Sequence, residues 1–499
     1  MHQLAIDILT IFAVISFVIF CVLIVVVLLV YIRDKLQTKQ AILRNYPVIG
    51  HFRYFFEYLG HFFRQYFFAA DREELPFNRA DRSWVYRAAK NIDTTVAFGS
   101  TRSLTNTGAV IFVNCPFPTM RCDAVQPECI TIGPYCKHPY STKSLFNISA
   151  MSFGALSAPA VQALSHGAKK ANCWLNTGEG GIAPYHLEGG CDLIAQIGTA
   201  KYGYRTLGGK LDHDKLREAA AYPQVKMFEL KLSQGAKPGK GGILPAAKVT
   251  AQIAHIRGIP AGEDSISPNR HPEINDVAAL LDLVAEVREV TQKPVGIKAV
   301  LGSGVLIADI CEEINKRGKT SAPDYISIDS ADGGTGAAPA ALMDYMGMPI
   351  KESLPMTVDL LIKHGLRDRI KVIASGKLIT PAQIAWSLCV GADFVVSARG
   401  FMFALGCIQA MQCNKNTCPT GVTTHDKRLQ AGLVPVSKAE RVSAYVHNML
   451  HEVGQIAHSC GVREPRQLGR DHCRIVLDNG MSVPLTELYR VPQDENNNS

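Results

Sequence analysis

Three cysteines that lie close together are the clearest chemical signal in the sequence. Cys407, Cys413 and Cys418 are separated by five and by four residues, and polar residues such as Asn414 and Lys415 lie between them. Cysteine thiolates at this density are typical of a metal or iron–sulfur site. Thiols packed in a core are the alternative, although a polar loop is an unusual place for three of them. Three ligands indicate either a cluster with three irons or a fourth ligand elsewhere in the chain.

Two loops of glycine and basic residues could bind a phosphate group. They are Ser375-Gly376-Lys377 and Ala398-Arg399-Gly400, each directly after a short apolar segment. Backbone N–H groups of such loops bind phosphate oxygens, and Lys377 and Arg399 would add positive charge. A phosphate-bearing cofactor such as FMN fits these loops. The sequence has no GxGxxG motif in a βαβ setting, so nothing in it supports a nicotinamide site.

Two lysines lie within or at the end of apolar segments. Lys298 lies between Val-Gly-Ile and Ala-Val, and Lys231 follows Glu229-Leu. A surface position is the simpler alternative for any lysine, but one inside an apolar strand is expected to point into a site. An ammonium group there would stabilise a reduced, anionic flavin ring or hold a carboxylate of a substrate.

The elements that must position these residues alternate between short apolar strands and amphipathic helices over residues 146–424. Eight strands with crossover helices predict an α/β protein with a (β/α)8 TIM barrel rather than a doubly wound open sheet. In such a barrel the loops after the strands meet at one end, where active sites are built. The predicted strands are Phe146–Ala150, Cys173–Leu175, Ala195–Gly198, Met227–Leu230, Val295–Ala299, Tyr325–Ile328, Lys371–Ala374 and Phe394–Ser397.

The start of the chain is predicted to be a membrane anchor. Residues 8–32 carry no charge, and at about 1.5 Å per residue they can cross about 30 Å of hydrocarbon as one transmembrane helix. A cleaved signal peptide would have a shorter apolar stretch and basic residues before it, and this segment has neither. A buried core helix is the remaining alternative. Because Arg33, Lys35 and Lys39 follow directly, we expect a single-pass protein of the cell membrane with its catalytic domain in the cytoplasm.

Residues 33–70 form a juxtamembrane segment rich in aromatic and basic residues. From Phe52 to Phe68, ten of seventeen residues are Phe or Tyr, and most of them recur at spacings of three and four. This pattern predicts a helix that lies either in the membrane interface or against the catalytic domain.

Residues 71–145 are predicted to be an irregular lead-in segment with short strands. Cys115, Cys122, Cys129 and Cys136 recur in it every seven residues, but prolines between them exclude a single helical face. Close CxxC pairs, which are typical of metal sites, are absent. We expect packed or exposed thiols, with a metal site as the weaker alternative.

Composition limits the remaining possibilities. The 499 residues are 47% hydrophobic and 19% charged, as in a folded protein. The net charge, 52 − 44 = +8, is small and is not gathered beside a readout motif, so no nucleic acid partner is expected. Fourteen cysteines without an export signal indicate thiols or metal ligands in a reducing compartment.

Residues 425–499 are predicted to form a helix at Val442–Gly454 and a short strand pair.

Several longer motifs resemble the FMN-binding synthase domain of glutamate synthases. The resemblance covers residues 140–460, and the motifs follow one another in the same order as in that family. They are Ile148-Ser-Ala-Met-Ser-Phe-Gly-Ala-Leu-Ser157, Asn176-Thr-Gly-Glu-Gly-Gly181, Gln234-Gly-Ala-Lys-Pro-Gly239, Asp332-Gly-Gly-Thr-Gly336, Gly365-Leu-Arg-Asp-Arg369 and Asn416-Thr-Cys-Pro-Thr-Gly421.

The resemblance implies a barrel that carries FMN and a 3Fe–4S cluster, the latter held by Cys407, Cys413 and Cys418. It implies reduction of 2-iminoglutarate, formed from 2-oxoglutarate and ammonia, to L-glutamate by hydride transfer from the flavin. The expected catalytic residues are Lys231, Gln234, Lys298 and, as proton donor, Glu179. The expected FMN-binding residues are Met151, Ser152, Asn176, Thr177, Lys298, Asp332, Gly333, Gly334, Ser375, Gly376, Lys377, Ala398, Arg399 and Gly400.

The sequence also departs from the large glutamate synthases. Those begin with a glutaminase domain, whereas this sequence begins with the apolar segment, so we expect ammonia from another source. Lys240 replaces the acidic residue that follows Gln-Gly-Ala-Lys-Pro-Gly in the family, and Ser375 replaces one of two paired glycines. The chain is therefore most similar to a stand-alone, membrane-anchored branch of the family.

Two alternative functions remain open. One is an FMN and iron–sulfur oxidoreductase that acts on a different amino acid or imine, and the other is an electron-transfer subunit of a membrane complex. The electron donor is unknown, and a ferredoxin-like protein or a separate reductase is expected.

Overall fold

The computed structural model describes residues 2–489, so the last part of the predicted C-terminal segment, residues 490–499, lies outside it. The chain divides after Ala80 into two compact units. The first is helical, and the second contains the barrel.

The first unit is dominated by one long apolar helix. Helix α1 (His2–Leu36) includes a candidate membrane span, Gln3–Leu36, whose most apolar window has a mean hydropathy of 3.5 and no buried residue. Helix α2 (Ala41–Asn45), helix α3 (Gly50–Phe63) and the π-helical turn η1 (Arg64–Phe68) follow. The predicted aromatic helix is therefore present, but its last five residues change from α- to π-helical geometry.

The second unit is built around a closed barrel of eight parallel strands, which confirms the predicted fold class. All eight predicted strands are present, with bounds shifted by up to two residues. In spatial order the barrel runs β10-β11-β12-β13-β4-β5-β6-β7. The bounds are β4 (Phe146–Ile148), β5 (Leu175–Asn176), β6 (Leu193–Ile197), β7 (Val225–Lys231), β10 (Val295–Ala299), β11 (Tyr325–Asp329), β12 (Lys371–Ser375) and β13 (Phe394–Ser397).

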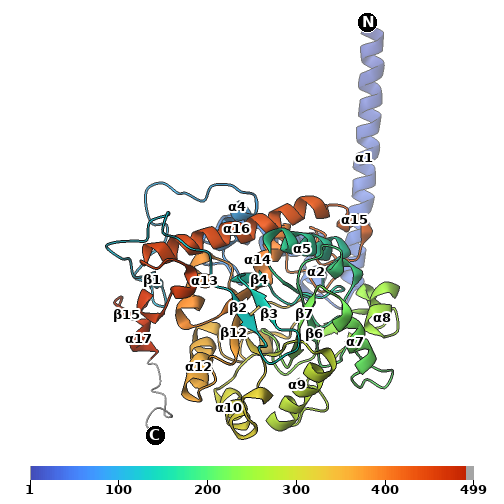
Figure 1. Ribbon diagram of the computed structural model, residues 1–499. Helices are drawn as coiled ribbons and strands as arrows, with labels where there is room; N and C mark the ends of the chain where they lie inside the picture. The colour runs from blue at the N-terminus through green and yellow to red at the C-terminus, as the bar shows by residue number, and fades with distance from the viewer. Residues whose placement is uncertain (1, 490–499) are drawn as a thin grey trace. The chain divides into compact units, whose positions relative to one another are not determined.

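Helices connect successive strands and cover the outside of the barrel (Figure 1). Side chains cap several of them; Asp276, for example, accepts a hydrogen bond from the Ala279 N–H at the start of α9. The bounds are α5 (Ala158–Ala171), α6 (Pro184–Leu187), α7 (His213–Ala221), α9 (Val277–Thr291), α10 (Val305–Arg317), α11 (Ala340–Met343), α12 (Ile350–Lys363), α13 (Pro381–Val390) and α14 (Arg399–Leu405), with the 3₁₀ turn η3 (Lys319–Ser321).

A hydrophobic cluster closes the barrel at the N-terminal ends of its strands. Met227 of β7, Tyr325 of β11 and Phe394 of β13 belong to it, and Ile132 and Tyr140 join it from the hairpin of β2 (Ile130–Ile132) and β3 (Tyr140–Thr142). This packed end leaves the C-terminal ends of the strands as the open mouth of the barrel.

Segments on both sides of the barrel sequence pack together. Helix α16 (Pro435–Ser459) lies against α5, and its Tyr445 contacts Phe146 and Phe401, whose rings stack 5.2 Å apart. The helix is longer than predicted because Pro435 begins it well before the apolar stripe.

The lead-in segment, expected to be irregular, contains helix α4 (Arg79–Ala89) and strand β1 (Val110–Phe112). Strand β1 pairs with β14 (Cys473–Val476), which in turn pairs with β15 (Ser482–Pro484). The elements α15 (Lys427–Gln430), η4 (Pro465–Gln467), η5 (Arg470–His472) and α17 (Leu485–Leu488) complete this part.

The connection between β7 and β10 is an excursion over the barrel mouth. It contains strands β8 (Ile243–Leu244) and β9 (Ser265–Ile266), the turn η2 (Ala246–Lys248) and helix α8 (Ala251–Arg257). This excursion brings Leu244, Lys248 and Arg257 to the mouth, so it forms part of the wall of the site.

The closed end of the barrel should be sensitive to a cavity. Met227 is fully buried, so we expect Met227→Ala to lower the free energy of unfolding by about 2–5 kcal/mol. The matched change Met481→Ala, at a side chain that is 68% exposed, should stay within about 0.5 kcal/mol. Denaturant unfolding of the detergent-solubilised full chain measures both, and equal effects would show that the cluster does not stabilise the barrel.

Candidate active site at the barrel mouth

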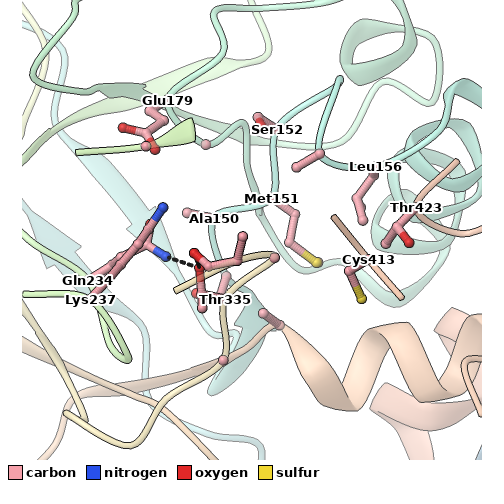
Figure 2. Close-up of a pocket in the computed structure, with 18 of the residues that line it drawn as sticks. Ala150, Met151, Ser152, Leu156, Glu179, Gln234, Lys237, Thr335, Cys413 and Thr423 are labelled. Atoms are coloured by element: carbon pink, nitrogen blue, oxygen red, sulfur yellow. Dashed lines mark hydrogen bonds between the residues drawn. The ribbon is translucent and has the colours of Figure 1, made fainter. Parts of the chain in front are cut away.

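A cavity of about 180 Å³ lies at the C-terminal ends of the barrel strands. Figure 2 shows side chains from several loops converging on it, with Glu179 and Cys413 on different sides. Thirteen of the predicted site residues line it: Met151, Ser152, Glu179, Lys231, Gln234, Lys298, Gly334, Ser375, Gly376, Lys377, Ala398, Arg399 and Cys413.

A buried ion pair lies on one wall. The Lys231 ammonium nitrogen is 2.7 Å from Glu179 Oε1 and donates a second hydrogen bond to Gln234 Oε1 at 2.6 Å. Burial would raise the pKa of Glu179, but the Lys231 charge, with Lys237 and Arg257, holds it below its ordinary value. Glu179 is therefore a carboxylate at neutral pH.

A second lysine lies beside the first. Lys298 is the register partner of Lys231 on the neighbouring strand β10, and its ammonium nitrogen is 3.5 Å from Asp329 Oδ2. The same oxygen accepts the Gly235 N–H at 2.8 Å. Two adjacent buried ammonium groups would repel each other, and a carboxylate against each of them offsets this repulsion.

Two predicted flavin-binding residues, Asn176 and Thr177, are buried and do not line the cavity. The Asn176 amide donates to Glu229 Oε1 at 2.8 Å, and the Gln196 amide donates to the same oxygen at 2.7 Å. Thr177 is fully buried, and its hydroxyl accepts the Gln196 N–H at 3.2 Å. Burial raises the pKa of Glu229 above its ordinary value. Through these contacts Asn176 and Thr177 support Gln196, which lines the cavity.

The predicted phosphate loops lie side by side at the ends of β12 and β13. Gly376 has φ +103°, and a Cβ there would lie 2.4 Å from Ser330 Cβ, so only glycine lets the loop after β12 approach the end of β11 this closely. A Cβ on Gly400 would meet the Tyr445 hydroxyl at 2.3 Å. The close-packed backbone and the neighbouring cations Lys377 and Arg399 fit a phosphate group.

Two residues of the Asp332 motif lie outside the cavity wall. The Asp332 carboxylate forms an ion pair with the Lys377 ammonium group at 3.0 Å, so two of the predicted cofactor-binding residues are paired with each other. Gly333 packs on Gly235, where an added Cβ would lie 2.8 Å from the Gly333 Cα.

A hydrogen-bonding group lies near the sulfur atom of each of the three predicted cluster cysteines. The Gln409 N–H lies 3.5 Å from Cys407 Sγ, the Arg399 guanidinium 3.9 Å from Cys413 Sγ, and the Thr420 hydroxyl 3.5 Å from Cys418 Sγ. Such donors stabilise negative charge on sulfur and tune iron–sulfur clusters.

The pKa values indicate that these thiols influence one another. Burial, assisted by negative charge on Cys413 and Cys418, raises the pKa of Cys407 to about 11. Burial alone would also raise the pKa of Cys418, but hydrogen bonds from Thr420 and Thr423 lower it. Within residues 2–489, no three His, Cys, Asp or Glu side chains form a group that could hold a metal ion. Cys407, Cys413 and Cys418 therefore lie near one another without forming such a group, and their role as cluster ligands stays a prediction.

The seven-residue cysteine series has no common site. Cys115 donates to the Phe117 carbonyl, Cys136 lies 3.6 Å from Asp324 Oδ2, and Cys122 and Cys129 are exposed. Among the described residues none of the four belongs to a group that could hold a metal.

Three cationic side chains at the site were not predicted from the sequence. Lys237, Lys248 and Arg257 line the cavity and are buried. Burial and the neighbouring Lys231 lower the pKa of Lys237 to about 8. Lys237 belongs to the Gln234 motif and could have been found there. Lys248 and Arg257 lie on the β7–β10 excursion, and no local pattern indicates its return to the mouth.

Comparison with known proteins identifies the family. Residues 89–463 match the family model described as the conserved region in glutamate synthase. The glutamate synthase large subunit-like protein YerD of Bacillus subtilis is 38% identical over 96% of this chain and 98% of its own length. The archaeal glutamate synthase [NADPH] of Methanocaldococcus jannaschii is 33% identical over 66% of this chain.

The match covers only part of the length of such archaeal-type proteins. The chain spans 61% of the length of the Methanocaldococcus protein. A glutamate synthase large subunit-like protein of Rhizobium meliloti is 27% identical over 80% of this chain and 91% of its own length. With the family model covering most of the chain, these matches show that it belongs to the glutamate synthase family of oxidoreductases that act on the CH–NH2 group.

Proposed function

We propose that this protein reduces 2-iminoglutarate, formed from 2-oxoglutarate and ammonia, to L-glutamate. The observation that carries the proposal is a chain of polar contacts across the barrel mouth. It runs from Glu179 through Lys231, Gln234 and Thr335 to Arg399, whose guanidinium reaches Cys413. The cationic wall and one of the predicted cluster cysteines, Cys413, thus line the same cavity.

The cations of this wall fit a dicarboxylate substrate. Lys231, Lys237, Lys298 and Arg257 all line the cavity. Ammonium and guanidinium groups out of bulk water bind carboxylates more strongly than exposed ones do. Gln234, held by Lys231 and by Thr335 at 3.1 Å, can orient the bound acid.

Glu179 would handle the protons of the reaction, as its position beside Lys231 in the cavity wall supports. As a carboxylate it can take a proton from ammonium, which leaves ammonia free to attack the carbonyl carbon of 2-oxoglutarate. After water is lost, Glu179 can return that proton to the imine nitrogen. Lys231 holds the carboxylate in position throughout.

Two cofactors complete the proposal. Gly376, Lys377, Ala398, Arg399 and Gly400 would hold the phosphate of FMN, with Met151 and Ser152 beside the ring, and Cys407, Cys413 and Cys418 would hold a 3Fe–4S cluster. Bound FMN would supply a hydride and the cluster single electrons. The electron donor would be a ferredoxin-like protein or a separate reductase.

The proposal includes a single membrane anchor. The length and apolar composition of α1 support a span. Basic residues at its C-terminal end, including Arg33 and Lys35, support a cytoplasmic catalytic domain.

The test uses the full chain in detergent, purified anaerobically and photoreduced. On mixing with 2-oxoglutarate and ammonium, flavin reoxidation should require both compounds, and L-glutamate should form. Reoxidation by other 2-oxo acids with ammonium, but not by 2-oxoglutarate, would move the substrate elsewhere in the family. If the enzyme contains its full complement of FMN and iron and no 2-oxo acid with ammonium reoxidises the flavin, the proposal is contradicted.

The cluster ligands are tested by cysteine replacement. We expect Cys413→Ser to lose iron while FMN is retained, because the flavin site lies mainly on other loops. Cys115→Ser, at a half-buried thiol outside the site, should keep both. Iron and flavin analysis of the purified variants measures this, and full iron in Cys413→Ser would exclude Cys413 as a ligand.

The charge of Lys237 predicts a pH dependence. Because its pKa is about 8, the free enzyme loses this positive charge as the pH rises above 8, and binding of 2-oxoglutarate should weaken. In Lys237→Arg the charge persists, so the ratio of kcat/KM for 2-oxoglutarate, variant to parent, should rise by up to about tenfold per pH unit above pH 8.

The pH also changes the fraction of ammonium that is deprotonated, but this affects variant and parent equally and cancels in the ratio of their kcat/KM values. Lys240→Arg, at an exposed lysine nearby, should give a flat ratio. A flat ratio for Lys237→Arg as well would exclude Lys237 from substrate binding.

A further inference from the structure

The aromatic segment after α1 has no role in the proposed chemistry. It comprises α3 and η1, and its aromatic side chains are unusually exposed. Phe56 is 63% exposed and Phe67 73%, and Phe52, Phe55, Tyr58 and Phe68 are also more than half exposed. Soluble surfaces do not normally show this many exposed aromatic rings in one segment.

Hydrogen bonds fix the start of α3 to the last turn of α1. Asp34, 1% exposed, accepts the Val48 N–H at 2.9 Å and lies 2.9 Å from His51 Nε2. Val48 has φ +65°, a conformation that disfavours β-branched residues, and the bond to Asp34 helps to hold it. The chain therefore turns back at a defined point beside the end of the apolar helix.

Close packing of α2 on α3 stabilises the same turn. A Cβ on Gly50 would lie 3.0 Å from the buried side chain of Leu43. Because α1 is the candidate span, the first residues of α3 lie where that span ends. A helix held at that level meets the headgroup region of the bilayer.

The charge of the segment suits the same location. Residues 33–68 contain six Lys or Arg and two Asp or Glu, so their net charge is 6 − 2 = +4. Basic residues close to the end of a span are attracted to anionic lipids. Phe and Tyr rings prefer the boundary between headgroups and acyl chains.

We propose that α3 and η1 bind the interface of the membrane that α1 spans, with their aromatic rings at the headgroup boundary and their basic residues on anionic phospholipids. The proposal rests on the proposed membrane anchor. The segment would then act as a second contact that restricts how the catalytic unit moves above the bilayer. Packing of the same rings on the barrel or on another protein is the competing outcome.

The test places single tryptophan reporters in the full chain reconstituted in lipid vesicles. The reporters are Phe56→Trp in α3, Phe17→Trp in α1 and, as an exposed control in the barrel unit, Phe98→Trp. Emission is compared with the parent protein, which has three native tryptophans. Vesicles of phosphatidylcholine with and without phosphatidylglycerol carry bromine either near the headgroup or deep in the acyl chains.

The proposal predicts that shallow bromines quench Phe56→Trp more than deep ones, and more with phosphatidylglycerol present. Deep bromines should quench Phe17→Trp more, and Phe98→Trp should not be quenched. Quenching of Phe17→Trp without quenching of Phe56→Trp would overturn the interfacial helix while leaving the anchor intact. Absence of quenching at both positions would overturn the anchor as well.

Discussion

The arrangement of the barrel mouth depends on how Lys231 is held. This lysine lies at the end of β7, beside Lys298 on β10, so two cations share a buried wall. A carboxylate lies against each of them, Glu179 at 2.7 Å from Lys231 and Asp329 at 3.5 Å from Lys298. With this neutralisation, Lys231 can also orient Gln234, and through Thr335 the same chain of contacts extends to Arg399 and Cys413.

The barrel makes this arrangement possible because parallel strands end at one level. Residues at successive strand ends therefore meet although they are far apart in the chain. The packed cluster around Met227 and Tyr325 fills the opposite end, so the polar groups gather at the open mouth. The excursion after β7 then covers the mouth and brings Lys248 and Arg257 into a wall that is already cationic.

Much of this could be predicted from the sequence, for a physical reason. Buried parallel strands are short apolar segments, so all eight could be found, and a lysine inside one of them, such as Lys298, stands out. The contributions of Asn176 and Thr177 could not be separated from those of wall residues, since strand-end residues can point into or beneath a cavity. Lys248 and Arg257 could not be found because tertiary contacts alone decide where a long excursion folds.

Replacement of Lys231 tests the account most directly. The variant Lys231→Met is compared with Lys226→Met, a change on the same strand at a more exposed lysine paired with Asp192. With FMN and iron contents equal to the parent, Lys231→Met should bind 2-oxoglutarate about 30-fold more weakly or worse, as judged by the flavin spectrum, which corresponds to about 2 kcal/mol. Lys226→Met should bind it normally. Parent-like affinity in Lys231→Met would contradict the assignment of this wall to the substrate.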